Sequence, residues 1–412
     1  MRTLILSLIL FACSLSCVFA QSGARMQALK FMQQGDNFMS FGNWEQALLS
    51  YDNAIQTDLN FAEPYMKRAN LNAKLGRTNE ALRDYNKAIS INPYSEYIYD
   101  QRAKIKMIAM DYKGAIDDIS AAISINPTSN KLLDHRAEDF IIIGEYEKAL
   151  EDIDTLIKRE YNLEYLYQKK ALVHLLNDNL QESLSVIDSA LSINDSSSMV
   201  YDMLGVIFLK KKQYNDAIEA FEKAVNINPE FAIAYYNMAL TYRYLGNQKK
   251  ASEILNKAVS VSQNIPNIYF TRALVRKELG DVEGAIEDYT NAISNDKNYS
   301  SALYNRAFGL KLLGNYTDAL KDANTLIEID PKNPNNWNLK GNIHLLFGDY
   351  YSAIESYSKA INNDYEHAMS YYNRGLAYLM TYRPYEGCDD LQKALDLNYT
   401  KAQEVISNFC GN

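Results

Sequence analysis

The residues best suited to metal binding or nucleophilic catalysis are few in this chain of 412 residues, which has four histidines and four cysteines. None of the histidines (His135, His174, His344 and His367) stands at a metal-ligand spacing from a cysteine or from another histidine. No glycine-rich phosphate loop and no G-x-S-x-G motif occurs. The sequence therefore predicts a protein without enzyme activity, metal or cofactor.

The composition indicates an ordered protein that does not bind nucleic acid in general. Hydrophobic residues make up 47% of the chain and charged residues 23%, which is enough apolar material for a core. The formal net charge of −9 lacks the basic footprint that nucleic-acid binding needs. Tyrosine is unusually frequent, with 32 copies against 2 tryptophans.

The first twenty residues have the pattern of a secretory signal. Arg2 is the only charge before Arg25, an apolar run covers residues 4–12, and Val18-Phe19-Ala20 offers a cleavage site before Gln21. Two alternatives stay open: a bacterial lipoprotein signal ending at Cys13, and an uncleaved membrane anchor. The first interpretation predicts an exported protein of the periplasm or the cell surface. The anchor and the lipoprotein are the cases in which a membrane would be a partner.

Cleavage would leave two cysteines, Cys388 and Cys410. An oxidising compartment would favour a disulfide between them. The alternative is two separate buried thiols, which are common in helical cores.

Small residues recur every 34 residues through most of the chain. We call the clearest of them the anchor, and it stands at Ala47, Ala81, Ala115, Ala149, Ser183, Ala217, Ala251, Ala285, Ala319, Ala353 and Gly387. Another alanine or glycine lies twelve positions before each anchor. A fixed period of this length is the signature of a repeat architecture.

Each repeat contains two stretches of helical apolar periodicity separated by a short turn. The small residues allow the two helices to approach closely where they cross. All prolines after residue 20 fall at helix boundaries or in connections, where the missing N–H group costs little.

The pattern resembles the tetratricopeptide repeat family, whose helix–turn–helix period is 34 residues. The motif is clearest in the sixth repeat, at Tyr201, Leu204-Gly205, Phe208, Tyr214, Ala217, Phe221, Ala224 and Pro229. The resemblance implies an all-α, right-handed α-α superhelical solenoid of about eleven repeats. The expected division is a signal peptide at 1–20, a lead-in at 21–27, the repeats at 28–401 and a capping helix at 402–412.

Arginine and aspartate occur together in the same six repeats and are both absent from the other five. Since a partly buried arginine without its carboxylate would be costly, we predict an ion pair between the two helices of each of these repeats. The predicted structural pairs are Arg68–Asp84, Arg102–Asp118, Arg136–Asp152, Arg272–Asp288, Arg306–Asp322 and Arg374–Asp390.

In the tetratricopeptide repeat family the first helix of each repeat lines a concave wall. The resemblance therefore implies a binding surface of apolar, phenol and amide side chains. The candidate residues are Tyr165, Tyr201, Tyr236, Leu240, Tyr244, Phe270, Tyr304, Phe308, Asn338, Asn342 and Tyr372. The predicted function is a non-enzymatic scaffold for protein or peptide partners. The alternative is a chaperone-like or cell-envelope assembly factor that holds apolar client segments.

Overall fold

The computed structural model describes residues 22–411. The predicted signal segment, residues 1–20 with Cys13, therefore lies outside the described residues. Residues 22–411 form helices and no strand, which confirms the predicted all-α class. Among these residues, every helix is too short or too polar to cross a lipid bilayer.

The chain divides into two compact units, one before and one after residue 195. The N-terminal unit holds five helix pairs. Its helices are residues 22–40, α2 (Trp44–Thr57), α3 (Ala62–Lys74), α4 (Thr78–Ile91), α5 (Glu96–Ile108), α6 (Tyr112–Ile125), α7 (Asn130–Ile143), α8 (Tyr146–Lys158), α9 (Leu163–Leu176) and α10 (Leu180–Ile193). The first helix thus includes residues that were predicted as a lead-in.

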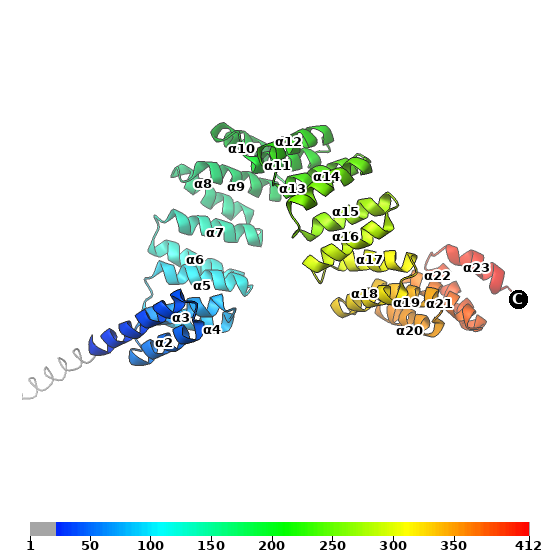
Figure 1. Cartoon of the computed structure of the whole chain (residues 1–412), viewed down its shortest axis with the longest axis horizontal. Coiled ribbons are helices and arrows are strands. Elements are labelled where there is room, and N and C mark those ends of the chain that lie inside the picture. Colours follow the sequence, from blue (N-terminus) through cyan, green and yellow to red (C-terminus); the bar gives the residue numbers. More distant parts are fainter. Residues whose placement is uncertain (1–21, 412) are drawn as a thin grey trace, which may run out of the picture. The chain divides into compact units, whose positions relative to one another are not determined.

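The C-terminal unit holds six helix pairs and a final helix at the position predicted for the cap. Its helices are α11 (Ser198–Lys210), α12 (Tyr214–Ile227), α13 (Ala232–Tyr244), α14 (Gln248–Val261), α15 (Pro266–Glu278), α16 (Val282–Asn295), α17 (Ser300–Leu312), α18 (Tyr316–Ile329), α19 (Pro334–Phe347), α20 (Tyr350–Asn363), α21 (Ala368–Met380), α22 (Pro384–Asp396) and α23 (Lys401–Phe409). Figure 1 shows these helices following one another in chain order within the unit.

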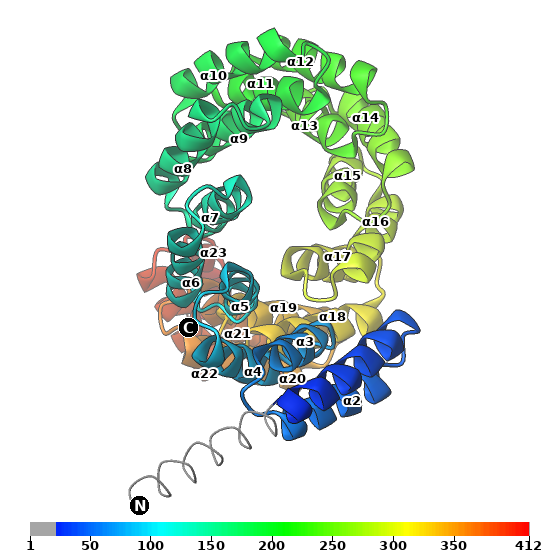
Figure 2. The same ribbon diagram turned by 90° about the vertical axis from the view of Figure 1, so that its left-hand side faces the viewer.

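Within each unit, the first helices from α3 to α21 pack most closely on the second helix of their own repeat. In the C-terminal unit the first helices α13, α15 and α17 lie on the inner side of the curve, and α12, α14 and α16 lie on the outer side (Figure 2). Contacts therefore run almost entirely between neighbours in the chain, as expected of stacked repeats.

The anchor residues sit at the helix crossings, where the space admits only small side chains. The alanine anchors are at most 2% exposed. At Gly205, twelve positions before the anchor Ala217, there is no space even for a methyl group, because a Cβ atom there would lie 2.5 Å from Cε1 of Phe221. The small residues thus let the helices approach, and an aromatic ring fills the adjoining space.

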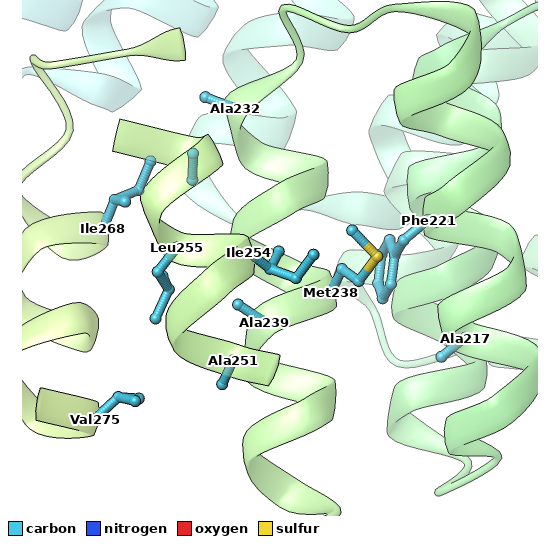
Figure 3. Close-up of a cluster of buried hydrophobic side chains, with 11 residues drawn as sticks. Ala217, Phe221, Ala232, Met238, Ala239, Ala251, Ile254, Leu255, Ile268 and Val275 are labelled. Atoms are coloured by element: carbon cyan, nitrogen blue, oxygen red, sulfur yellow. The ribbon is translucent and has the colours of Figure 1, made fainter. Parts of the chain in front are cut away.

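In the seventh repeat, which lacks the arginine–aspartate pair, the corresponding positions are apolar. In the cluster around α13 and α14, Met238 and Ile254 occupy the positions that hold arginine and aspartate elsewhere, and both are buried. Figure 3 shows Met238 between Ile254 and the ring of Phe221. An apolar contact thus replaces the ion pair in this repeat.

The fifth repeat departs most from the pattern, yet it keeps the same backbone. Asp178 stands where most repeats have a turn glycine, and it adopts the same left-handed conformation with φ of 58°. Ser183 replaces the anchor alanine, and its Oγ donates to the carbonyl oxygen of Ala171 at 2.8 Å. The buried hydroxyl therefore has a partner and is accommodated at the crossing.

Candidate functional site

Six arginines join the two helices of their repeats through aspartates. Each donates two hydrogen bonds of 2.6–2.9 Å, from Nε and Nη2, to the carboxylate sixteen residues later. The pairs are those expected from the sequence: Arg68–Asp84, Arg102–Asp118, Arg136–Asp152, Arg272–Asp288, Arg306–Asp322 and Arg374–Asp390. All six aspartates are buried. These charges hold helices together and are not free to bind a ligand.

The same arginines also reach the preceding repeat, which the sequence did not suggest. The remaining nitrogen, Nη1, donates to a polar side chain sixteen residues earlier, on the second helix of the repeat before. The acceptors are Asp52, Asn86, Ser120, Asn256, Thr290 and Ser358. Each arginine therefore links three helices.

A second polar network connects successive first helices. Its pairs are 35 residues apart, one more than the repeat length. They are Asp100–His135 at 2.5 Å, Asp134–Lys169 at 2.6 Å, Asp202–Asn237 at 2.9 Å, Arg243–Glu278 at 2.6 Å and Asn338–Asn373 at 3.1 Å. One residue of this network, Asn338, was assigned to ligand binding from the sequence and is thus engaged within the protein.

Asn338 and Asn342 differ from the prediction for this reason. Asn338 is only 4% exposed, and its Oδ1 accepts bonds from Asn373 and from the hydroxyl of Ser370. Asn342 accepts from the hydroxyl of Tyr357 at 2.8 Å and from Asn373 at 2.9 Å. Both amides therefore connect helices of the C-terminal unit.

Tyr201 and Tyr372 also depart from the prediction, because both pack between helices. Tyr201 lies against Ala224 and Val225, in the cluster formed with α12. The ring of Tyr372 lies on that of Tyr399 with 4.9 Å between their centres. These rings contribute to interhelical packing.

Tyr165 is separate from the other candidates, since it lies in the N-terminal unit. Its hydroxyl donates to Glu138 at 3.0 Å, and the ammonium of Lys169 lies 4.5 Å from its ring centre. Lys169 also pairs with Asp134. Tyr165 therefore belongs to a charged network along α7 and α9.

That network continues to α5 through His135. His135 contacts Asp100 through Nδ1, and its Nε2 lies 3.7 Å from Asp139. Burial raises the pKa of Asp100, but hydrogen bonds from His135 and Lys104 outweigh it and lower this pKa to about 2. Burial raises the pKa of Asp139 above its usual range. No role for His135 was predicted from the sequence, although its spacing of 35 residues from Asp100 would have been a signal.

Six of the predicted side chains remain on the first helices of three consecutive repeats, α13, α15 and α17. We call them the aromatic strip: Tyr236, Leu240, Tyr244, Phe270, Tyr304 and Phe308. Tyr244, Tyr304 and Phe308 are 68%, 38% and 37% exposed. The other three are half-buried, and one face of the Phe270 ring packs against the rings of Tyr289 and Tyr299. The protein thus presents apolar and phenol surface on these three helices.

Two hollows open beside the aromatic strip. One of about 320 Å³ is lined by Leu240, Arg243, Tyr244, Gln248 and Glu278. The other, of about 430 Å³, is lined by Phe270, Ser300, Ser301, Tyr304, Asn305, Leu326, Asn333, Asn335 and Asn336. Its lining contains no charged side chain. Hydroxyl, amide and aromatic groups of this kind suit the neutral backbone and side chains of a peptide.

Cys388 and Cys410 form a disulfide with an S–S distance of 2.00 Å. The bond joins α22 to the residue that follows the capping helix α23. The capping helix covers the end of the last repeat through Ala402, Val405 and Ile406. Among residues 22–411, no group of three or more histidine, cysteine, aspartate or glutamate side chains has a metal-binding arrangement.

Family comparison identifies the repeats. Profiles described as tetratricopeptide repeat or TPR repeat match residues 62–95, 205–243, 232–265, 270–334 and 313–365. The chain is a tetratricopeptide repeat protein. No curated protein matches its sequence at a significant level.

Solved structures of other tetratricopeptide repeat proteins resemble this one at low sequence identity. A protein from Parabacteroides merdae is 16% identical with a TM-score of 0.45, over 69% of this chain and 99% of its own. The C-terminal part of one from Cytophaga hutchinsonii is 17% identical with a TM-score of 0.46, over 55% and 94%. Yeast Tom70 is 14% identical with a TM-score of 0.37, over 92% and 93%.

Proposed function

We propose that this tetratricopeptide repeat protein binds segments of other proteins along the aromatic strip. Repeats of this family generally mediate protein–protein interaction. The observation that carries the proposal is that α13, α15 and α17 carry six apolar or phenol side chains beside two hollows, three of them exposed and three half-buried. Tyrosine suits such recognition because it offers a large contact area and one hydroxyl with little loss of entropy.

Tyr304 is the centre of the proposed surface. It lines the larger hollow, and Phe308 lies one helical turn further along α17. Burial raises the pKa of Tyr304, so its hydroxyl stays protonated and able to donate at neutral pH. An extended segment lying across α15 and α17 would meet both rings.

Selection of random displayed peptides against the full chain tests the proposal. Binding of each selected peptide, measured by fluorescence polarisation, should weaken at least tenfold in Tyr304→Asp. The matched control is Tyr385→Asp, an 86% exposed tyrosine at the start of α22 and outside the aromatic strip. Unchanged melting temperatures establish that both variants fold.

Two outcomes would count against the surface. Peptides that bind Tyr304→Asp as well as the unmodified chain would place recognition elsewhere. Selected peptides that share nothing but apolar content, together with broad suppression of client aggregation, would favour the alternative of a chaperone-like or envelope assembly factor.

We also propose that the protein binds rather than catalyses, and that it does so after export to the periplasm or cell surface. Export is supported by the apolar run that follows Arg2, and the Cys388–Cys410 disulfide suits an oxidising compartment. Sequencing the N-terminus of the mature protein tests the proposal, and a chain that begins at Gln21 is expected. A chain that retains Met1 would contradict cleavage.

A further inference from the structure

Five of the six first helices of the C-terminal unit, all except α11, are together basic, although the whole chain carries a net charge of −9. Helices α13, α15, α17, α19 and α21 together contain one carboxylate, that of Glu278. They contain eight arginines and lysines: Arg243, Arg272, Arg276, Lys277, Arg306, Lys311, Lys340 and Arg374. The net charge of these five helices is therefore positive, whereas that of the whole protein is negative.

Four of these eight cations are neutralised from the second helices. Arg272 and Arg276 pair with Asp288, Arg306 pairs with Asp322, and Arg374 pairs with Asp390. These four cations are engaged in ion pairs within the protein. The cations that remain include the twelfth residue of each of the three consecutive first helices α13, α15 and α17.

Those three are Arg243, Lys277 and Lys311, each 34 residues from the next, and we call them the basic row. Arg243 pairs with Glu278. Lys277 donates to the amide oxygen of Asn305 at 3.1 Å, so it meets a neutral partner. Asn305 in turn lines the larger hollow beside Tyr304. The basic row thus lies on the same three helices as the aromatic strip.

Lys311 has no carboxylate partner among the described residues. Its ammonium lies 4.2 Å from the centre of the Phe308 ring, and its side chain is half-buried. Burial lowers the pKa of Lys311, since the charged form loses part of its hydration without gaining an anion. Tyr304, Phe308 and Lys311 follow one another at helical spacing, so the aromatic rings and the free cation share one face of α17.

We propose that the protein segment bound at the aromatic strip is acidic, with a carboxylate that pairs with Lys311 while an adjacent apolar side chain lies on Tyr304 and Phe308. A carboxylate would restore to Lys311 the electrostatic stabilisation that burial removes. A second carboxylate about one repeat away would meet Lys277. This inference rests on the proposed function and specifies the partner's chemistry.

The acidic peptide is favoured over a nucleic acid by the rest of the surface. The basic row has only two cations that lack a carboxylate, and the chain's net charge would repel a long polyanion. The larger hollow offers neutral amides and hydroxyls rather than further cations. One or two carboxylates beside apolar groups therefore fit the row better than a phosphate backbone.

A pair of small probes isolates the role of the carboxylate. N-acetylphenylalanine and its C-terminal amide share the ring and differ only in charge. The full chain, with its lysines ¹³C-dimethylated, is titrated with each probe, and the methyl resonance of Lys311 is followed by NMR. The resonance is assigned from its loss in Lys311→Gln.

We expect the acid to shift the Lys311 resonance and to bind about fivefold more tightly than the amide, as for a partly exposed ion pair. Lys311→Gln should remove that preference. The matched control is Lys257→Gln, which removes the same charge from an exposed position on the second helix α14 and should keep the preference.

Three results would overturn the inference: no shift of Lys311 with the acid, equal binding of acid and amide, or a preference that survives in Lys311→Gln. A fourth would be tighter, Lys311-dependent binding of a ten-residue oligothymidylate than of any acidic peptide. The peptide selection distinguishes a failure of the acidic-ligand inference from a failure of the proposed binding function. Selected peptides that need Tyr304 but have no acidic residue would leave the binding surface in place and refute its acidic ligand.

Discussion

Arg306 donates two hydrogen bonds, of 2.8 and 2.7 Å, to the buried carboxylate of Asp322. No other ion pair to Asp322 forms among residues 22–411. Asp288, in the preceding repeat, is paired with both Arg272 and Arg276. The six arginine–aspartate pairs are therefore alike in geometry. They differ in whether another cation still contacts the buried aspartate when the arginine is removed.

We predict that Arg306→Ala destabilises the protein by about 3 kcal/mol, because it leaves the Asp322 carboxylate buried without a cation. Arg272→Ala should cost less, since Arg276 still faces Asp288. In double-mutant cycles measured by chemical denaturation, both couples (Arg306 with Asp322, Arg272 with Asp288) should be non-additive. Additive losses would refute the pairing, and the exposed Arg83–Glu80 pair serves as a control with little coupling.

Removing the hydroxyl groups of two buried tyrosines should have different effects. The hydroxyl of Tyr357 donates to Asn342, whereas that of Tyr289 is buried without a hydrogen-bond partner in the described structure. Tyr357→Phe should therefore cost about 1 kcal/mol, while Tyr289→Phe should be neutral or stabilising. Thermal denaturation of the two variants is the measurement. Equal losses would show that the Tyr289 hydroxyl has a partner after all.

Asp202 should make the protein's stability fall as the pH rises through 6. Burial raises the pKa of this carboxyl to about 6, although a hydrogen bond from Asn237 acts in the other direction. A folded-state pKa above the unfolded value means that the stabilising protonated form is lost between about pH 4 and pH 7. Asp202→Asn should thus be more stable than the unmodified protein at pH 7.5, by on the order of 2 kcal/mol, and similar to it at pH 4.

Melting temperatures of both proteins between pH 4 and pH 7.5 measure this difference. Asp389→Asn, at an exposed position on α22, controls for the loss of one negative charge. A difference between Asp202→Asn and the unmodified protein that does not change with pH would exclude titration of Asp202 as the cause.

Reduction of the Cys388–Cys410 disulfide should loosen the capping helix α23 first. The bond closes a loop with a sequence separation of 22 residues, and a loop of this size corresponds to about 3 kcal/mol of unfolded-state entropy. Hydrogen exchange of residues 401–409 should accelerate in Cys410→Ser, with little change in α11 to α19. Added reductant should then have no further effect on that variant. Unchanged exchange would mean that apolar packing alone holds α23.

The repeat period made most of the fold predictable, because one spacing accounts for both the small residues at helix crossings and the arginine–aspartate partners. The predicted tetratricopeptide architecture is confirmed. The period did not predict which residues of successive first helices face each other, since these pairs are separated by one residue more than the repeat length. That offset brings Asp202 to Asn237 and Asn338 to Asn373, and a search at multiples of 34 does not find pairs at 35.

The candidate site was predictable only in part for the same reason. The aromatic residues of α13, α15 and α17 were found from their positions in the repeat. Asn338 occupies an equivalent position, but its amide oxygen accepts hydrogen bonds from Asn373 and Ser370. Only the packing of α19 on α21 reveals these bonds. Conversely, Lys311 stands out because it lacks a carboxylate partner, and a lack of partners cannot be read from a sequence.

The disulfide at the end of the array also determines how the protein would respond to a mechanical load. The nine residues of α23 lie between the two cysteines, so tension applied beyond Cys410 passes through the sulfur atoms to Cys388 and bypasses this helix. The final repeat, rather than the cap, would bear the force. If the protein is tethered by this end, peeling of its terminal helix is not the first event, and the strength of the attachment is that of α21 packed on α22.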